Sequence, residues 1–151
     1  MSDLETKSSG DLFSVSVTPG TLRVSFSATL ENIDRAVEET KRFVGACGME
    51  RQMFELILIL REGLTNAVVH GCSCHHEMTI RYRLSLHSDF LEIEIEDEGE
   101  GFDWRDGCLL QTPGIECYCG RGMAIMKSYS GEMRFNEKGN ILTLLKMFND
   151  R

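Results

Sequence analysis

A carboxylate, an amide and an imidazole recur at every fourth position in one segment of the chain, as Glu62, Asn66 and His70. On a helix this spacing places the three side chains along one face. An amide oxygen is a good ligand for Mg²⁺, and a carboxylate one turn away can take a proton or hold a water molecule. The same spacing also fits an ordinary solvated helix face, so the spacing alone leaves both interpretations open.

A second cluster joins acidic residues to glycines. Asp97 continues the alternating phase of the apolar residues between positions 91 and 95, so its side chain is expected on the apolar side of a strand. A buried carboxylate needs a partner, and an acceptor in an apolar slot suits the amino group of adenine. Gly99 and Gly101 let a flat ligand or a phosphate approach the backbone. The alternative is a plain acidic turn that closes the strand, which the phase of Asp97 disfavours.

A third cluster is the run Gly120-Arg121-Gly122, which precedes a short apolar helical pattern. The first N–H groups of a helix have no partner within the helix and can bind an anion, and Arg121 adds a cation. A single G-x-G run usually marks only a turn, so this cluster gains weight only together with the other two.

Hydrophobic periodicity predicts the elements that position these clusters. A period of two predicts strands, and a helical period predicts three helices. The first helix is expected after a cap at Thr29, with Cys47 closing its apolar stripe, and the run 54–60 in the second helix is expected to be nearly buried. The strands are predicted at 13–17, 22–28, 78–86, 91–97, 132–136 and 141–148, and the helices at 29–48, 49–70 and 121–130. This order predicts an α+β fold, a two-layer sandwich with a mixed, mostly antiparallel sheet covered on one face by helices.

Composition sets the class of protein. The chain has 151 residues, 42% hydrophobic and 26% charged, which are ordinary globular values. We predict a flexible tail over residues 1–10 and a single domain over 11–149. Its net charge of −8 disfavours direct binding of nucleic acid. No apolar run approaches the ~20 residues of a membrane helix, and the N-terminus lacks a signal-like pattern. We therefore expect a cytoplasmic protein with reduced cysteines and no membrane contact.

In this order and spacing the three clusters resemble the N, G1 and G2 boxes of the GHKL superfamily, whose domain is the Bergerat ATP-binding fold. Residues 62–70 match E-x-x-x-N-A-x-x-H, residues 97–103 match D-x-G-x-G-F-D, and residues 120–125 match the second glycine box. The resemblance covers nearly all of the chain from the first predicted strand to the last.

Within that superfamily the chain is similar to the anti-sigma factor serine/threonine kinases of bacterial partner-switching systems. Its length matches a free-standing domain, and we expect no preceding phosphoacceptor hairpin of the sensor kinase type. The resemblance implies ATP and Mg²⁺ as cofactors. It also implies two protein partners, a sigma factor or other output protein and a small STAS-type antagonist that is phosphorylated. A homodimer is a further possible assembly.

The resemblance also implies a role for each matching residue. Glu62 would be the general base, Asn66 would ligate Mg²⁺, and Asp97 would accept from the adenine amino group. The glycines would line the nucleotide and its phosphates, with Arg121 beside them. This second group comprises Gly99, Gly101, Gly120 and Gly122.

Two positions depart from the pattern of the group. Tyr118 stands where some of these kinases have an arginine near the terminal phosphate, and Asn140 follows Gly139 where the group often has threonine. A non-catalytic ATP-binding module that sequesters its partner is therefore the alternative function, and a plain interaction domain is a further one. The pairs Cys72/Cys74 and Cys117/Cys119 could bind zinc or form a redox-sensitive bond, with reduced, incidental thiols as the simplest interpretation.

Overall fold

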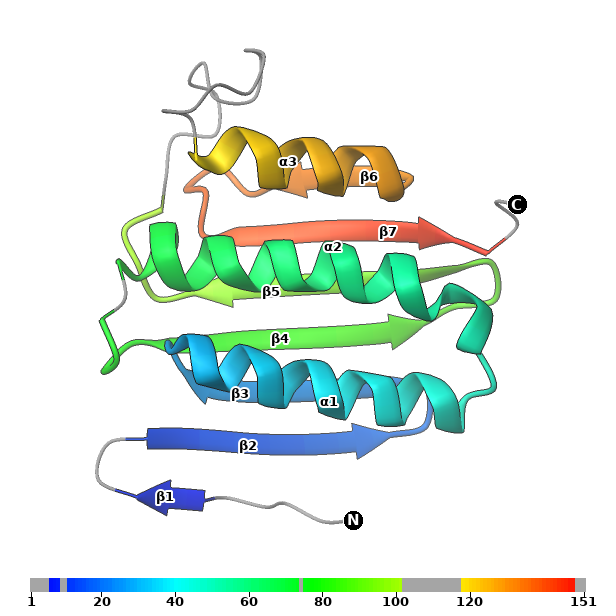
Figure 1. Ribbon diagram of the computed structural model, residues 1–151, viewed down its shortest axis with the longest axis horizontal. Helices are drawn as coiled ribbons and strands as arrows, with labels where there is room; N and C mark the ends of the chain where they lie inside the picture. Colours follow the sequence, from blue (N-terminus) through cyan, green and yellow to red (C-terminus); the bar gives the residue numbers. More distant parts are fainter. Residues whose placement is uncertain (1–5, 9–10, 74, 102–117, 149–151) are drawn as a thin grey trace.

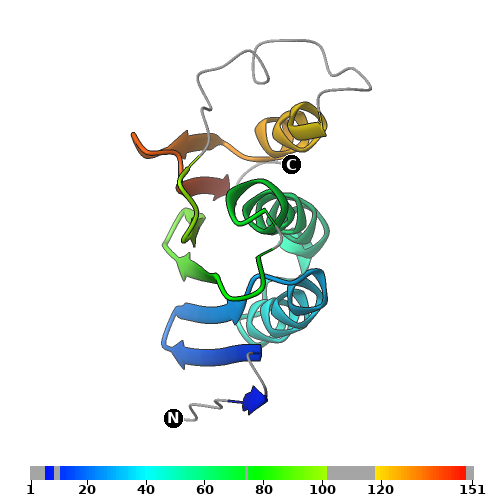
Figure 2. The ribbon, with the colours of Figure 1, turned by 90° about the vertical axis from the view of Figure 1, so that its left-hand side faces the viewer.

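The computed structural model describes residues 6–8, 11–73, 75–101 and 118–148 of the chain. Seven strands form one sheet in the order β1-β2-β3-β4-β5-β7-β6, and helices cover one face of it, which confirms the predicted two-layer α+β architecture (Figures 1 and 2). The strands are β1 Thr6–Ser8, β2 Asp11–Thr18, β3 Thr21–Ser27, β4 Thr79–Leu86, β5 Phe90–Asp97, β6 Glu132–Phe135 and β7 Ile141–Met147. The α-helices are α1 Leu30–Ala46, α2 Met53–Asn66 and α3 Tyr118–Tyr129.

Every pairing between neighbouring described strands is antiparallel, so the prediction of a mixed sheet was wrong in that detail. Short hairpin connections join β2 to β3 and β4 to β5, and such connections produce antiparallel neighbours. The strand β1 lies within the segment predicted as a tail and pairs with β2 at the edge of the sheet. The register places Arg83 opposite Glu94, and their side chains approach to 3.5 Å on the face that carries no helix.

The core lies between the sheet and the helices. Tyr82, Phe26 and Leu84 are among the fully buried side chains of the strands, and Leu56 and Leu60 among those of α2. At the start of α1, the hydroxyl oxygen of Thr29 accepts a hydrogen bond from the backbone N–H of Asn32 at 3.2 Å, which confirms the predicted cap. The apolar stripe of α1 ends one turn earlier than predicted, because the helix stops at Ala46 and Cys47 is exposed.

The second predicted helix is divided into three parts. A 3₁₀ turn at Glu50–Gln52 precedes α2, and a π-helical segment at Ala67–Gly71 follows it. The prediction of a nearly buried run was wrong at its first residue, because Phe54 is 76% exposed on the outer side of the helix. Period 3.6 turns one residue in each turn of a surface helix toward solvent, even in an apolar run.

The strand β7 carries a buried charged residue. Lys146 of β7 occupies an inward-facing position and is 3% exposed. Its Nζ donates to Oε1 of Glu55 in the first turn of α2, whose side chain is 45% exposed. None of the described helices combines the length and the apolar character that crossing a bilayer requires.

Candidate functional site

Asp97 is the last residue of β5, and its side chain points to the helical side of the sheet, as its phase predicts. It is 7% exposed. Its Oδ1 accepts a hydrogen bond of 2.9 Å from the backbone N–H of Gly99. Burial raises the pKa of the Asp97 carboxyl, and the Gly99 N–H and the charge of Lys138 oppose that rise only in part. The site therefore holds an acceptor group at a position where its charge is poorly solvated.

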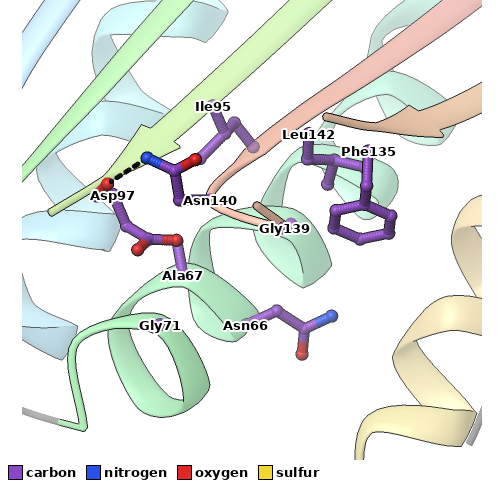
Figure 3. A pocket seen from close by; sticks show the side chains of 10 residues that line it. Asn66, Ala67, Gly71, Ile95, Asp97, Phe135, Gly139, Asn140 and Leu142 are labelled. Atoms are coloured by element: carbon purple, nitrogen blue, oxygen red, sulfur yellow. Dashed lines mark hydrogen bonds between the residues drawn. The ribbon is translucent and has the colours of Figure 1, made fainter. Parts of the chain in front are cut away.

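A pocket lies over Asp97, between α2 and the ends of β5, β6 and β7 (Figure 3). Its walls combine apolar surface with a few polar groups, the usual composition of a site for a small molecule. The apolar lining residues include Ala67, Ile95, Phe135 and Leu142, and the polar ones are Asn66, Asp97 and Asn140. The chemistry of an apolar slot with one carboxylate suits a purine ring that carries an amino group.

Glycines allow the segments around this pocket to pack in direct backbone contact. A β-carbon on Gly71 would lie 2.4 Å from Oδ2 of Asp97, and one on Gly99 would lie 1.8 Å from the carbonyl oxygen of Gly71. Gly101 has a φ of +85°, and a β-carbon there would lie 1.9 Å from the carbonyl oxygen of Lys138. Gly99 and Gly101 thus let the backbone after β5 pass against the π-helical segment and the β6–β7 turn.

Glu62 and Asn66 lie on consecutive turns of α2 and face the start of α3. A β-carbon on Gly122 would lie 2.7 Å from Oε1 of Glu62 and 3.6 Å from both polar atoms of the Asn66 amide. The Nδ2 atom of Asn66 is buried and has no hydrogen-bond partner among the described residues. An amide with an unpaired buried polar atom at the edge of a pocket is suited to a ligand.

The second glycine box adopts a different local structure from the predicted one. The helix α3 begins at Tyr118 rather than near Arg121. The N–H of Gly120 belongs to the first turn, where helical N–H groups lack partners within the helix. Gly122 lies beyond that turn, so its N–H falls within the helix, and its contribution is the absence of a side chain against Glu62. The side chains of Tyr118 and Arg121 lie outside the described part of the structure.

Most of the pocket residues, Gly71 and Asn140 among them, were not predicted as site residues. Gly71 directly follows the first motif, but nothing in the local sequence indicates its contact with Asp97. Asn140 stood out only as a departure from a family pattern, and it lines the pocket. The Nδ2 of Asn140 donates to the backbone carbonyl of Asp97 at 3.3 Å (Figure 3).

The cysteine hypotheses fall largely outside the described residues. Cys72 is buried without a disulfide, and burial raises the pKa of its thiol, which lowers its reactivity. Cys74 and Cys117 are not described, and the side chain of Cys119 is not described either. Within the described ranges, no group of three or more His, Cys, Asp or Glu side chains could hold a metal ion.

Comparison with known proteins identifies the family of the chain. A family model described as the histidine kinase-like ATPase domain matches residues 26–146. The chain belongs to this family. The matched range includes Glu62, Asn66 and Asp97, and the description of the family as an ATPase domain implies ATP binding.

The similar proteins found by sequence include anti-sigma F factors. An anti-sigma F factor of Clostridium perfringens (strain ATCC 13124) is 24% identical over 137 residues, 86% of this chain and 88% of the relative. That of Priestia megaterium is 32% identical over 88 residues, 55% of this chain and 59% of the relative. Among solved structures, the histidine kinase domain of the Erythrobacter litoralis EL346 blue-light activated histidine kinase gives a TM-score of 0.45 and 22% identity. That match covers 62% of this chain and 43% of that chain.

Proposed function

We propose that this protein is an ATP-dependent serine/threonine protein kinase and an anti-sigma-like switch protein of the cytoplasm. It would phosphorylate a small STAS-type antagonist and sequester a sigma factor or another output protein. The observation that carries this proposal is the convergence of Glu62, Asn66 and Gly122 beside a pocket that Asn66 and Asp97 both line. The anti-sigma F factor names of the relatives support the choice of partners.

The described residues fit the nucleotide and its cation. Asp97 is placed to accept from an adenine amino group between the apolar walls. The Asn66 amide, whose Nδ2 atom has no partner among the described residues, can turn its oxygen toward a cation, and an amide oxygen is a hard ligand of the kind Mg²⁺ takes. When bound, ATP supplies the phosphoryl group and Mg²⁺ neutralises phosphate charge. The N–H of Gly120 in the first turn of α3 would face the phosphates.

Glu62 would act as the base. It accepts the proton of the serine or threonine hydroxyl while the hydroxyl oxygen bonds to the γ-phosphorus. The bond from that phosphorus to the β–γ bridging oxygen breaks, and ADP leaves. Phosphoryl transfer depends mainly on positioning and charge neutralisation, so a small set of groups suffices.

The test is transfer of γ-labelled phosphate from ATP to STAS-type proteins recovered from native cells with this protein as bait. We expect label on a serine or threonine, with Mg²⁺ required. ATP binding with nucleotide-dependent capture of a partner, but without any transfer, would instead establish the non-catalytic sequestering module. No detectable nucleotide binding by calorimetry would refute both functions.

A further inference from the structure

The face of the sheet that carries no helix separates its charges by strand (Figure 2). Arg23 of β3 and Arg81 and Arg83 of β4 form an arginine cluster on this face, and the register places Arg23 directly opposite Arg83. Like charges at directly opposite positions of an antiparallel pair destabilise the pairing. The arginine cluster therefore gains from any negative charge that lies close to it.

Glutamates of β5 supply negative charge on one side of the arginine cluster. Nη2 of Arg83 lies 3.5 Å from Oε2 of Glu94, and Nη1 of Arg81 lies 3.9 Å from Oε1 of Glu96. The strand β4 separates β3 from β5, so Arg23 lies on the far side of β4 from these glutamates. The Arg23 guanidinium forms no ion pair with any residue in the described part of the chain. One arginine of the cluster is thus left without a counter-charge there.

A second observation concerns a buried donor in the same cluster. The Nε atom of Arg83 is buried and has no hydrogen-bond partner within the described ranges. All three arginines line a hollow of about 170 Å³ on this face. That volume is many times what a single water molecule needs, so it can admit a side chain. An arginine with an unpartnered donor in the wall of such a hollow is suited to an acceptor group from another molecule.

We propose that the arginine cluster is a docking site for an acidic segment of a partner protein, with Arg23 and Arg83 sharing one of its carboxylates. The guanidinium group offers parallel N–H donors that match the two oxygens of a carboxylate. Arg81 is two residues from Arg83 along the strand, a separation of about 7 Å. Carboxylates at positions i and i+2 of an extended segment have the same separation, so one segment can reach the whole cluster.

The charges around the hollow favour a few separate carboxylates over a polyanion. Glu94 and Glu96 line the same hollow, and the chain as a whole carries a net charge of −8. Both repel a nucleic acid backbone, whereas a segment with spaced acidic residues places its charge only above the arginines. The face lies on the other side of the sheet from the nucleotide pocket, so this inference does not depend on the proposed function.

The experiment titrates the intact chain with the blocked peptide Ser-Glu-Ser-Glu-Ser and follows the arginine Nε–H signals by NMR. We expect saturable shifts of the Arg23, Arg81 and Arg83 signals at millimolar peptide. The affinity should fall in high salt, because the site is open to solvent and its charges are screened. The neutral peptide Ser-Gln-Ser-Gln-Ser should cause no saturable shift.

A variant and a matched control locate the binding. Arg23→Gln removes the charge and keeps a polar side chain, and we expect it to bind the acidic peptide about three- to tenfold more weakly. This is the scale of one charge-assisted contact at an exposed site. The control is Arg42→Gln in α1, which removes an exposed arginine whose ion pair with Glu39 lies away from this face. The control should bind the peptide as the wild type does.

Each other outcome would overturn the docking site. Equal binding of the two peptides, or equal affinity of the wild type and a folded Arg23→Gln variant for the acidic one, would exclude recognition of carboxylates by the cluster. Inorganic phosphate that binds at least as tightly as the peptide would show a site for a free anion only. Self-association of the wild type that Arg23→Gln abolishes would assign the face to a second copy of the chain. ATP binding, titrated in parallel, tests the proposed function separately.

Discussion

Gly71 and Asp97 are in such close contact that a β-carbon on the glycine would lie 2.4 Å from the carboxylate oxygen Oδ2. The π-helical segment therefore ends directly against the side chain that forms the polar end of the pocket. The carbonyl oxygen of Gly71 is in turn packed against Gly99, where a β-carbon would lie 1.8 Å from that oxygen. The carboxylate has little room to move, which fixes the acceptor in one place.

The first prediction concerns Gly71→Ala. The added methyl group must displace Asp97 or the backbone, so we expect at least a tenfold loss of ATP affinity and a destabilisation of about 1–3 kcal/mol, typical of overpacking. Calorimetry and denaturant unfolding measure the two effects. The matched control is Gly45→Ala in α1, where a β-carbon would meet nothing within 4 Å. That change should leave ATP affinity unaltered and stabilise the protein by up to about 1 kcal/mol. Normal ATP affinity in Gly71→Ala would contradict the contact's role.

The second prediction is that Asp97→Asn raises the stability of the folded protein at pH 7 and reduces its preference for ATP over GTP. Burial raises the pKa of Asp97, so the folded state binds this proton more tightly than the unfolded state does. Its contribution to stability is complete below the ordinary pKa of about 3.9 and is lost as pH rises through the raised value. At pH 7 we therefore expect Asp97→Asn to unfold at a higher temperature than the wild type, with the gap narrowing as the pH falls toward 4.

The same variant should lose much of its preference for ATP over GTP, because an amide offers a donor as well as an acceptor. Thermal unfolding across pH 4.5 to 8, paired with nucleotide titrations, measures both effects. A variant that is less stable than the wild type at every pH would contradict the account of the buried carboxylate.

Much of this site could be predicted from alternation and spacing, because both are local properties. The phase of β5 indicated that Asp97 points inward, and the helical spacing placed Glu62 and Asn66 on one face. The contact of Gly71 with Asp97 depends on how distant segments approach each other, and no local pattern contains that information. Lys146 shares the phase of Leu142 and Leu144, but both faces of β7 carry apolar residues, so alternation alone does not say which face is inward. The outward position of Phe54 shows a second limit of sequence patterns. A continuous apolar run predicts a mostly buried helix, but it does not indicate which of its residues faces solvent.

The third prediction concerns Asn66→Ala. If the amide oxygen ligates Mg²⁺, the variant should bind ATP about equally with and without Mg²⁺, whereas the wild type binds more tightly with it. The fold should persist, because the Asn66 Nδ2 atom makes no hydrogen bond within the described structure that the alanine would break. Titration of ATP in Mg²⁺ and in excess chelator gives the comparison. An unchanged effect of Mg²⁺ in a folded variant would exclude this residue as the ligand.

The fourth prediction concerns the ion pair between Lys146 and Glu55. Glu55→Gln leaves the buried ammonium group without a counter-charge, and we expect a loss of about 1–3 kcal/mol. This is below the cost for a fully buried pair, because the Glu55 side chain is 45% exposed and water can reach it. Lys146→Met removes the charge together with its need for a partner and should stay within about 1 kcal/mol of the wild type. Denaturant unfolding of both variants measures this asymmetry, and an equal loss in the two would contradict it.

The fifth prediction separates catalysis from binding at Glu62. Its Oε1 would lie 2.7 Å from a β-carbon on Gly122, so the carboxylate lies between α2 and α3. Glu62→Gln keeps the size of the side chain and removes its basicity. We expect ATP and partner binding to persist and the single-turnover rate of phosphate transfer to fall by roughly 10²-fold or more, the scale of losing a general base. Gly122→Ala should also slow transfer, because the new methyl group displaces the same carboxylate. If Glu62 only carries charge on the helix face, Glu62→Gln will transfer phosphate at the normal single-turnover rate and lose at most a little stability, and another group must then take the hydroxyl proton.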